Sequence, residues 1–176
     1  DVYKRQTKDF NNWEDLVVSI LENEDYDWNF KYLSTLPSIN WCDNILKIRS
    51  EEWDWDYLSE NSKCFSYNSK RPKELIKRIE KFDEWLNFAL LSKRKDVRLD
   101  LETISAHRSY PWDWNAISQN RSFALTAEFV MEHSDFDWEW AALSSRNDCI
   151  FTAEFIIENK DKDWNWAILS KRKEII

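Results

Sequence analysis

Glycine is entirely absent from the 176 residues, and proline occurs only three times. Without glycine, a turn that needs a positive φ must use another residue, and Asn or Asp tolerates that conformation best. The P-loop, the Rossmann fingerprint and the G-x-S-x-G hydrolase motif all require glycine, so none of them occurs in this chain. The sequence therefore excludes the common glycine-dependent nucleotide and hydrolase sites, and we expect neither catalysis nor a cofactor.

Cysteines are few, and long apolar runs are missing. Cys42, Cys64 and Cys149 lie far apart and form no CxxC pair, which favours free thiols in a reducing compartment. No apolar run approaches the roughly 20 residues of a membrane helix, and no signal peptide is visible. We therefore expect a cytoplasmic protein without membrane contact. The formal net charge of -8 argues against broad adhesion to nucleic acid or anionic lipid.

Tryptophan is abundant, with 12 residues, and it recurs in a motif. The pattern W-x-[WF]-x-x-[LI]-S appears six times, with one degenerate copy that starts at a leucine. The spacings between successive copies are 25, 33, 26, 26 and 26 residues, and the long one marks an insertion around residues 66–73. We number the repeats 1 to 6 by their motif starts: Trp28, Trp53, Leu86, Trp112, Trp138 and Trp164.

Each repeat is predicted to form two short helices. In repeat 5, Thr126 is a plausible N-cap for a first helix that runs to about His133. An acidic turn then leads into a second helix that carries Trp138 and Trp140 and ends near residues 145–147. Pro111 suits a helix start, and Asn61 and Asn120 could supply the left-handed residue that ends a helix.

The predicted fold is all-α, an α-solenoid of about six αα-hairpin repeats of about 26 residues. Trp138 and Trp140 point about 160° apart on a helix, so the second helix should bury two sides. An aromatic cage or a base-stacking surface is the alternative role of the indoles. Their helical periodicity favours a structural core made of Trp28, Trp53, Trp55, Trp112, Trp114, Trp138, Trp140, Trp164 and Trp166.

The chain divides into a short N-terminal segment and a single repeat array. Residues 1–6, DVYKRQ, fit no repeat position and resemble a translated adapter scar at the end of a metagenomic reading frame. Residues 7–176 form the array, which we expect to be a fragment of a longer protein. Nothing after Trp164 corresponds to the first helix that follows repeat 5. We therefore expect an uncapped, apolar C-terminal end and possible end-to-end self-association, with Ile175 and Ile176 as the alternative minimal cap.

The pattern D-W-x-W-x-x-L-S followed by T-x-E-F-I resembles short Trp-rich helical tandem repeats of giant-virus and bacterial proteins. The resemblance covers residues 28–170 and is strongest from Trp112 onward, whereas the unit between Trp53 and Leu86 departs from it. It implies a helical repeat fold. It implies no catalytic residue, because the function of those arrays is mostly unknown.

Basic residues gather after the second helices, where the helix dipole favours cations. As a row along a solenoid edge they could bind an acidic peptide or a phosphate backbone. The candidate binding residues are Lys93, Arg94, Lys95, Arg121, Arg146, Lys171 and Arg172. We expect a scaffold that binds a protein or peptide, and the alternative is a nucleic-acid-binding repeat array that uses this basic edge.

Three other patterns are interpreted as structural. Acidic pairs such as Asp135 and Asp137 precede the second helices, but they lack the glycine-bearing loop of a calcium site. His107 and His133 occupy equivalent places in adjacent repeats and have no metal-ligating partner nearby in the sequence. A serine ends each motif copy, and a residue needed six times indicates a hydroxyl bonded to the preceding helical turn. We therefore expect no metal site and no serine nucleophile.

Overall fold

The structure of the chain is a computed structural model that describes residues 13–23, 25–61, 63–66 and 72–172. Within these residues the protein is all-α: twelve α-helices are present and no strand is. The helices divide between two compact units, residues 1–64 and 65–176, which are described separately. The predicted N-terminal scar and the candidate cap, Ile175 and Ile176, lie outside the described residues.

Unit 1 holds repeats 1 and 2, each made of a first and a second helix. Helix α1 packs against α3, and α2 packs against α4, so helices of the same kind are neighbours. The elements are α1 (Trp13–Leu21), α2 (Phe30–Ser34), α3 (Asp43–Lys47), the 3-10 turn η2 (Ser50–Glu52) and α4 (Trp55–Asn61), followed by the 3-10 turn η3 (Lys63–Phe65) at the unit boundary.

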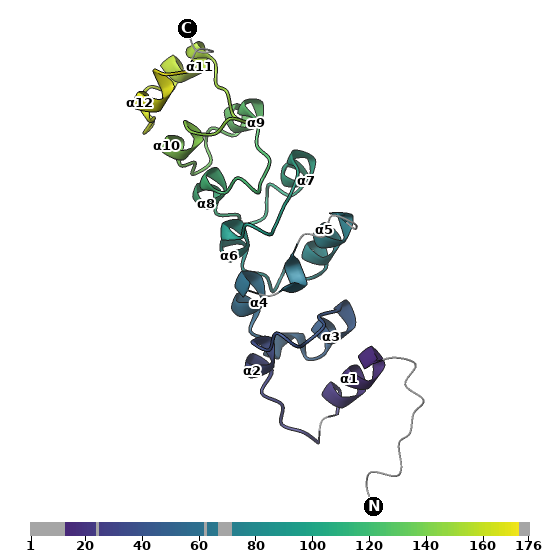
Figure 1. The fold of residues 1–176 in the computed structure, drawn as a ribbon. Coiled ribbons are helices and arrows are strands. Elements are labelled where there is room, and N and C mark those ends of the chain that lie inside the picture. Colours follow the sequence, from purple (N-terminus) through teal and green to yellow (C-terminus); the bar gives the residue numbers. More distant parts are fainter. Residues whose placement is uncertain (1–12, 24, 62, 67–71, 173–176) are drawn as a thin grey trace, which may run out of the picture. The chain divides into compact units, whose positions relative to one another are not determined.

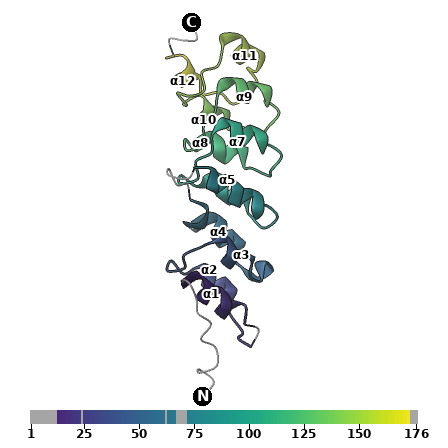
Figure 2. The same cartoon turned by 90° about the vertical axis from the view of Figure 1, so that its right-hand side faces the viewer.

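Unit 2 holds repeats 3 to 6 in the same arrangement. Its elements are α5 (Pro72–Lys81), α6 (Phe88–Lys93), α7 (Leu101–Ala106), α8 (Trp114–Gln119), α9 (Ala127–Glu132), α10 (Trp140–Leu143), α11 (Ala153–Glu158) and α12 (Trp166–Leu169). Helix α8 packs between α6 and α10. Figure 1 shows the second helices of this unit in one row and the first helices in another. The turned view in Figure 2 shows α7, α9 and α11 following one another in order.

The second helix begins two residues after the motif start in every repeat. The intervening residue is the N-cap: the side-chain oxygen of Asp113 accepts a hydrogen bond from the Ala116 N–H, and Asn165 caps Ile168 in the same way. Such caps satisfy a helix-terminal N–H that has no intrahelical partner. The prediction that Trp138 lies in the second helix is therefore wrong, because the chain is extended at Glu139 and α10 starts at Trp140.

The first helix of repeat 5 begins as predicted, and that of repeat 6 begins at the equivalent residue. The Thr126 hydroxyl accepts a hydrogen bond from the Phe129 N–H at 3.2 Å, and Thr152 does the same for Phe155. In repeat 4 the carboxylate of Asp100 takes this role, and its hydrogen bonds at Thr103 lower the pKa of Asp100. The three repeats therefore share one start for the first helix.

The chain has no glycine, and no described asparagine takes up the left-handed conformation in its place. The only positive φ among the described residues belongs to Arg49, at 45°. Asn120 is extended, with φ -87° and ψ 102°, and Asn61 is the last residue of α4. The prediction that these two asparagines end helices in the left-handed conformation is wrong. The residues that end the other helices of the described chain all have negative φ, for which glycine is not needed.

The first tryptophan of a motif closes its own repeat. The indole N–H of Trp138 donates to the carbonyl oxygen of His133, which ends the first helix, at 2.7 Å. Trp112 donates to His107 at 3.0 Å, and Trp164 to Asn159 at 2.7 Å. A buried indole N–H needs such a partner. The bond ties the start of the second helix to the end of the first.

The tryptophans expected in the core differ in exposure. Six of them are buried: Trp53, Trp55, Trp112, Trp138, Trp140 and Trp164. Trp28 and Trp114 are partly exposed. Trp166 is 52% exposed, so its prediction as a core residue is wrong. The equivalent Trp140 is covered by aromatic rings of the following repeat, and no described residue does this for Trp166.

The motif serine joins one repeat to the next. The hydroxyl of Ser144 donates to the carbonyl oxygen of Trp140 at 2.8 Å and accepts a hydrogen bond from the Asn165 N–H at 3.1 Å. The first of these bonds agrees with the predicted structural role. The second was not predicted, and it recurs at Asp54 to Ser34, Asp113 to Ser92 and Glu139 to Ser118.

Candidate functional site

The predicted basic row contains two buried arginines. Arg146 is 1% exposed, and its guanidinium donates to the carbonyl oxygens of Ile117, Asn120 and Phe123 in the preceding repeat at 2.7–3.2 Å. It also pairs with Asp148 at 2.6 Å. Partial burial alone would raise the pKa of Asp148, but the hydrogen bond and charge of Arg146 outweigh it and lower that pKa. The assignment of Arg146 to a ligand-binding surface is wrong, because its donors are occupied inside the protein.

Arg94 and Arg172 are also held by the protein. Arg94 is buried and binds both oxygens of Asp96, at 3.0 and 2.8 Å. This hydrogen bond, against the opposing effect of burial, lowers the pKa of Asp96 to about 2. Arg172 is partly exposed and donates to the carbonyl oxygens of Cys149 and Arg146. Both arginines are therefore removed from the candidate binding residues.

One repeat position therefore joins successive repeats through Asn120, Arg146 and Arg172. It lies eight residues after the motif start and holds Arg94, Asn120, Arg146 and Arg172. The Asn120 amide donates to the carbonyl oxygens of Ser92 and Arg94 at 2.9 and 2.7 Å. Asn120 thus bonds to carbonyl oxygens of repeat 3, as Arg146 bonds to those of repeat 4. A signal was present in the sequence: Arg-x-Asp at Arg94 and Arg146 places a carboxylate beside the guanidinium.

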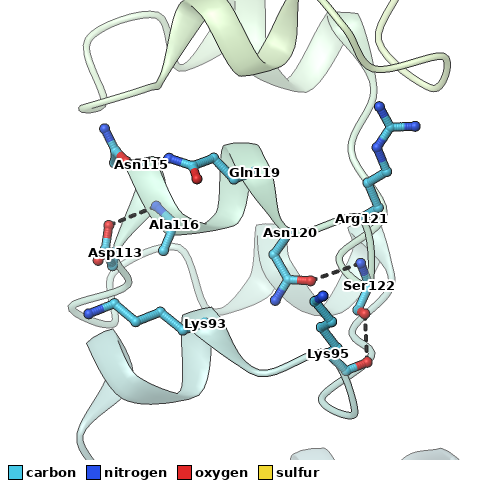
Figure 3. Close-up of a pocket in the computed structure, with 9 residues that line it drawn as sticks. All are labelled: Lys93, Lys95, Asp113, Asn115, Ala116, Gln119, Asn120, Arg121 and Ser122. Carbon is cyan, nitrogen blue, oxygen red and sulfur yellow. Dashed lines mark hydrogen bonds between the residues drawn. The ribbon is translucent and has the colours of Figure 1, made fainter.

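Three of the remaining basic residues surround one groove. Lys93 ends α6, Lys95 follows it, and Arg121 comes after α8. The groove has a volume of about 780 Å³ and lies over the outer side of α8, where Asn115 and Gln119 form its wall. Figure 3 shows these side chains around the opening. Lys171, the last predicted residue, is exposed after α12 and does not line this groove.

The groove carries positive charge that the protein does not neutralise. Among the described residues, neither Lys93 nor Lys95 forms an ion pair. The guanidinium of Arg121 donates one hydrogen bond, to the Ser145 carbonyl oxygen at 3.0 Å. The one acidic lining residue, Asp113, uses a carboxylate oxygen to cap α8. An anionic ligand would therefore meet cations whose charge is still available.

The wall of the groove supplies hydrogen-bonding groups beside these charges. The Gln119 amide donates to the Asn115 side-chain oxygen at 3.1 Å, and the Asn115 amide donates to Glu139 at 3.3 Å. Figure 3 shows that the basic side chains do not converge: Lys93 points to the left of the view and Arg121 points up on the right. Separated cations suit a ligand with several separated negative charges better than a single phosphate group.

The other groups considered from the sequence do not assemble a reactive site in the described part of the chain. No cluster of three or more His, Cys, Asp or Glu residues suited to a metal is found there. The His107 Nε2 atom lies 2.9 Å from Glu80, and His133 stacks on Phe136. Burial, chiefly, raises the pKa of the Cys149 thiol to about 12, so it remains protonated and unreactive.

Within the described residues, every helix is too short or too polar to cross a bilayer. Comparison of the chain with protein-family models, curated protein sequences and solved structures finds no match.

Proposed function

We propose that this chain is a helical-repeat scaffold, an α-solenoid of six αα-hairpin units, that binds an extended acidic segment of another protein. The segment lies in the groove over α8 and meets Lys93, Lys95 and Arg121 in turn. The observation that carries this proposal is the groove itself, where three basic side chains line one opening and the single lining carboxylate caps a helix.

The contacts between repeats support the scaffold part of the proposal. Ser92 and Ser118 each accept a backbone N–H from the following repeat, and Asn120 and Arg146 donate to carbonyl oxygens of the preceding one. Repeats that contact mainly their neighbours form extended arrays with long binding surfaces. Such a surface is fixed before the ligand arrives, which reduces the entropy cost of binding.

A protein ligand is favoured over nucleic acid by the charges of the whole chain. The formal net charge is -8, and the groove offers only three basic residues. Binding to a phosphate backbone draws its affinity from many such contacts. The acidic remainder of the chain repels a long polyanion, whereas a short acidic segment meets mainly the local groove charge. The ligand we propose is therefore a peptide with spaced Glu or Asp residues.

The proposal includes no catalytic step and an intracellular location. The hydroxyl of Ser118 both donates and accepts a hydrogen bond inside the repeat interface, which suits a structural residue. Cys42, Cys64 and Cys149 form no disulfide within the described part of the chain, which supports a reducing compartment.

Fluorescence anisotropy with three labelled probes tests the proposed class of ligand. The probes are a peptide with alternating Glu residues, the same peptide with Gln in place of Glu, and single-stranded DNA of equal charge. We expect only the Glu peptide to bind well, and its affinity to fall as ionic strength rises from about 0.01 M to about 0.15 M, because screening then shortens the reach of the charges. If DNA bound as tightly as the Glu peptide, the nucleic-acid alternative would be favoured. If the Gln peptide bound as tightly as the Glu peptide, the groove would not recognise its ligand by charge.

A further inference from the structure

Repeats 3, 4 and 5 pack through a recurring set of aromatic contacts. The aromatic residue two positions before a motif start packs on the aromatic residue two positions after the preceding start: Tyr110 on Phe88 at 4.7 Å, and Phe136 on Trp114 at 4.6 Å. The motif tryptophan packs on the same target, as Trp138 does on Trp114 at 5.0 Å. Together with the N–H to serine bond, these contacts form one repeated interface.

Repeat 6 presents one half of this interface without the other. Trp166 is the equivalent of Trp114 and Trp140, yet it is 52% exposed, whereas Trp140 is 6% exposed. The Ser170 hydroxyl bonds only to its own helix, at the carbonyl oxygen of Ala167, and accepts no N–H from another described residue. Both the aromatic target and the hydrogen-bond acceptor are therefore available.

Repeat 1 presents the complementary half. Tyr26 stands two positions before the motif start, like Phe136, and it is 53% exposed. Trp28 is partly exposed, although it is the equivalent of Trp138. The backbone N–H of Asn29, at the position of Glu139, has no hydrogen-bond partner among the described residues, so it is a donor of the kind that Ser170 lacks.

We infer that the repeat 6 surface around Trp166 and Ser170 binds repeat 1 of a second copy of this chain, head to tail. In that contact Tyr26 and Trp28 cover Trp166, and the Asn29 N–H donates to the Ser170 hydroxyl. The arrangement continues the interface that already joins repeat 4 to repeat 5. Because the two surfaces differ, the contact is heterologous, and copies can add one after another.

The distribution of exposed apolar side chains supports a partner at these two places. Tyr26 and Trp166, two of the exposed large hydrophobic residues of the described chain, lie at these two places. Contiguous exposed apolar surface marks interaction sites. Leu36 occupies the position of Arg146 in repeat 1, so the guanidinium bonds are missing, and the contact between copies is weaker than the internal one.

Sedimentation velocity over a concentration series tests this inference on the whole chain, with Tyr26→Glu and Trp166→Glu as variants. We expect the wild-type mass to rise above 21.5 kDa with concentration and each single variant to stay monomeric. An equal mixture of the two variants should form dimers, because the intact tail of one meets the intact head of the other. Tyr32→Glu is the matched control, since Tyr32 is 62% exposed in the same repeat and should associate like the wild type.

Three outcomes would overturn the inference. The first is a wild-type chain that stays at 21.5 kDa up to its solubility limit. The second is a Tyr26→Glu variant that associates normally, which would indicate contact between two tails through Trp166. The third is a failure of the variant mixture to form dimers. Both substituted side chains are more than half exposed, so far-UV circular dichroism should match that of the wild type.

Discussion

The Ser118 hydroxyl accepts a hydrogen bond from the backbone N–H of Glu139, 3.1 Å away and 21 residues later in the chain. The same hydroxyl donates to the Trp114 carbonyl oxygen at 2.7 Å. One small side chain thus satisfies a polar group in each of two repeats. Ser170, in repeat 6, bonds to the carbonyl oxygen of Ala167 in its own helix and to no other described residue.

We expect Ser118→Ala to lower the free energy of unfolding by about 1–3 kcal/mol, because it leaves a buried N–H without its acceptor. Ser170→Ala is the matched control and should change it by about 0.5 kcal/mol at most, as for exposed substitutions. Urea denaturation followed by circular dichroism measures both. Equal losses in the two variants would show that the bond to the next repeat is not what Ser118 contributes.

Arg146→Met removes a buried guanidinium and leaves Asp148 unpaired. We expect a loss of about 1–3 kcal/mol in the free energy of unfolding, because the carbonyl oxygens of Asn120 and Phe123 lose their donor, whereas Asp148 itself is 46% exposed. Arg121→Met, at an exposed arginine with a single hydrogen bond, should change it by about 0.5 kcal/mol. If Arg146→Met lowered the free energy of unfolding as little as Arg121→Met, Arg146 would not stabilise the packing of successive repeats.

The ion pair of Asp96 and Arg94 predicts a pH dependence. Because the folded pKa of Asp96 is lowered from 3.8 to about 2, its contribution is present above 3.8 and is lost as pH falls toward 2. Asp96→Asn has no such titration. The urea midpoints of wild type and variant should therefore differ by a constant amount from pH 5 to 7 and converge between pH 3.8 and about 2. A difference that persists at pH 2 would contradict this account.

Truncation of two equivalent tryptophans separates a covered indole from an uncovered one. Trp140→Ala should cost about 3–5 kcal/mol, as for large aromatic truncations in packed cores. Trp166→Ala should cost much less, since half of its surface is already exposed. Thermal unfolding of the two variants, measured at a dilution where the chain is monomeric, compares them directly. Similar losses would mean that Trp166 is packed in solution.

The helical class and the repeat period follow from the sequence because they rest on local patterns. The motif spans seven residues and recurs at a spacing of 26 in the last four copies, and the predicted cap at Thr126 involves residues three positions apart, which the structure confirms. The start of the second helix was misplaced by two residues. The residue after the motif start is Asn or Asp in five of the six copies, and in the structure its side chain caps the second helix, as at Asp113 and Asn165.

The different roles of the basic residues cannot be predicted from the sequence. Lys93, Arg94 and Lys95 are consecutive, and composition alone gives them one role. Their side chains differ because Arg94 is buried and binds Asp96 and Ser66, while both lysines are exposed. For Trp166 the sequence supports two expectations, a place in the core and an apolar C-terminal end, and the structure shows it 52% exposed because no described residue covers it.

Charge reversal in the groove tests the proposed function most directly. The variant Lys93→Glu/Lys95→Glu changes the groove, and Lys73→Glu/Lys77→Glu changes the net charge equally at two exposed lysines of α5 that do not line it. Affinity for the labelled Glu peptide is measured by anisotropy at the same ionic strength. We expect the groove variant to bind at least about tenfold more weakly, a loss of about 1.4 kcal/mol, and the α5 variant to bind within about twofold of the wild type, since distant exposed charges are screened. Equal weakening of both variants would contradict a specific site over α8.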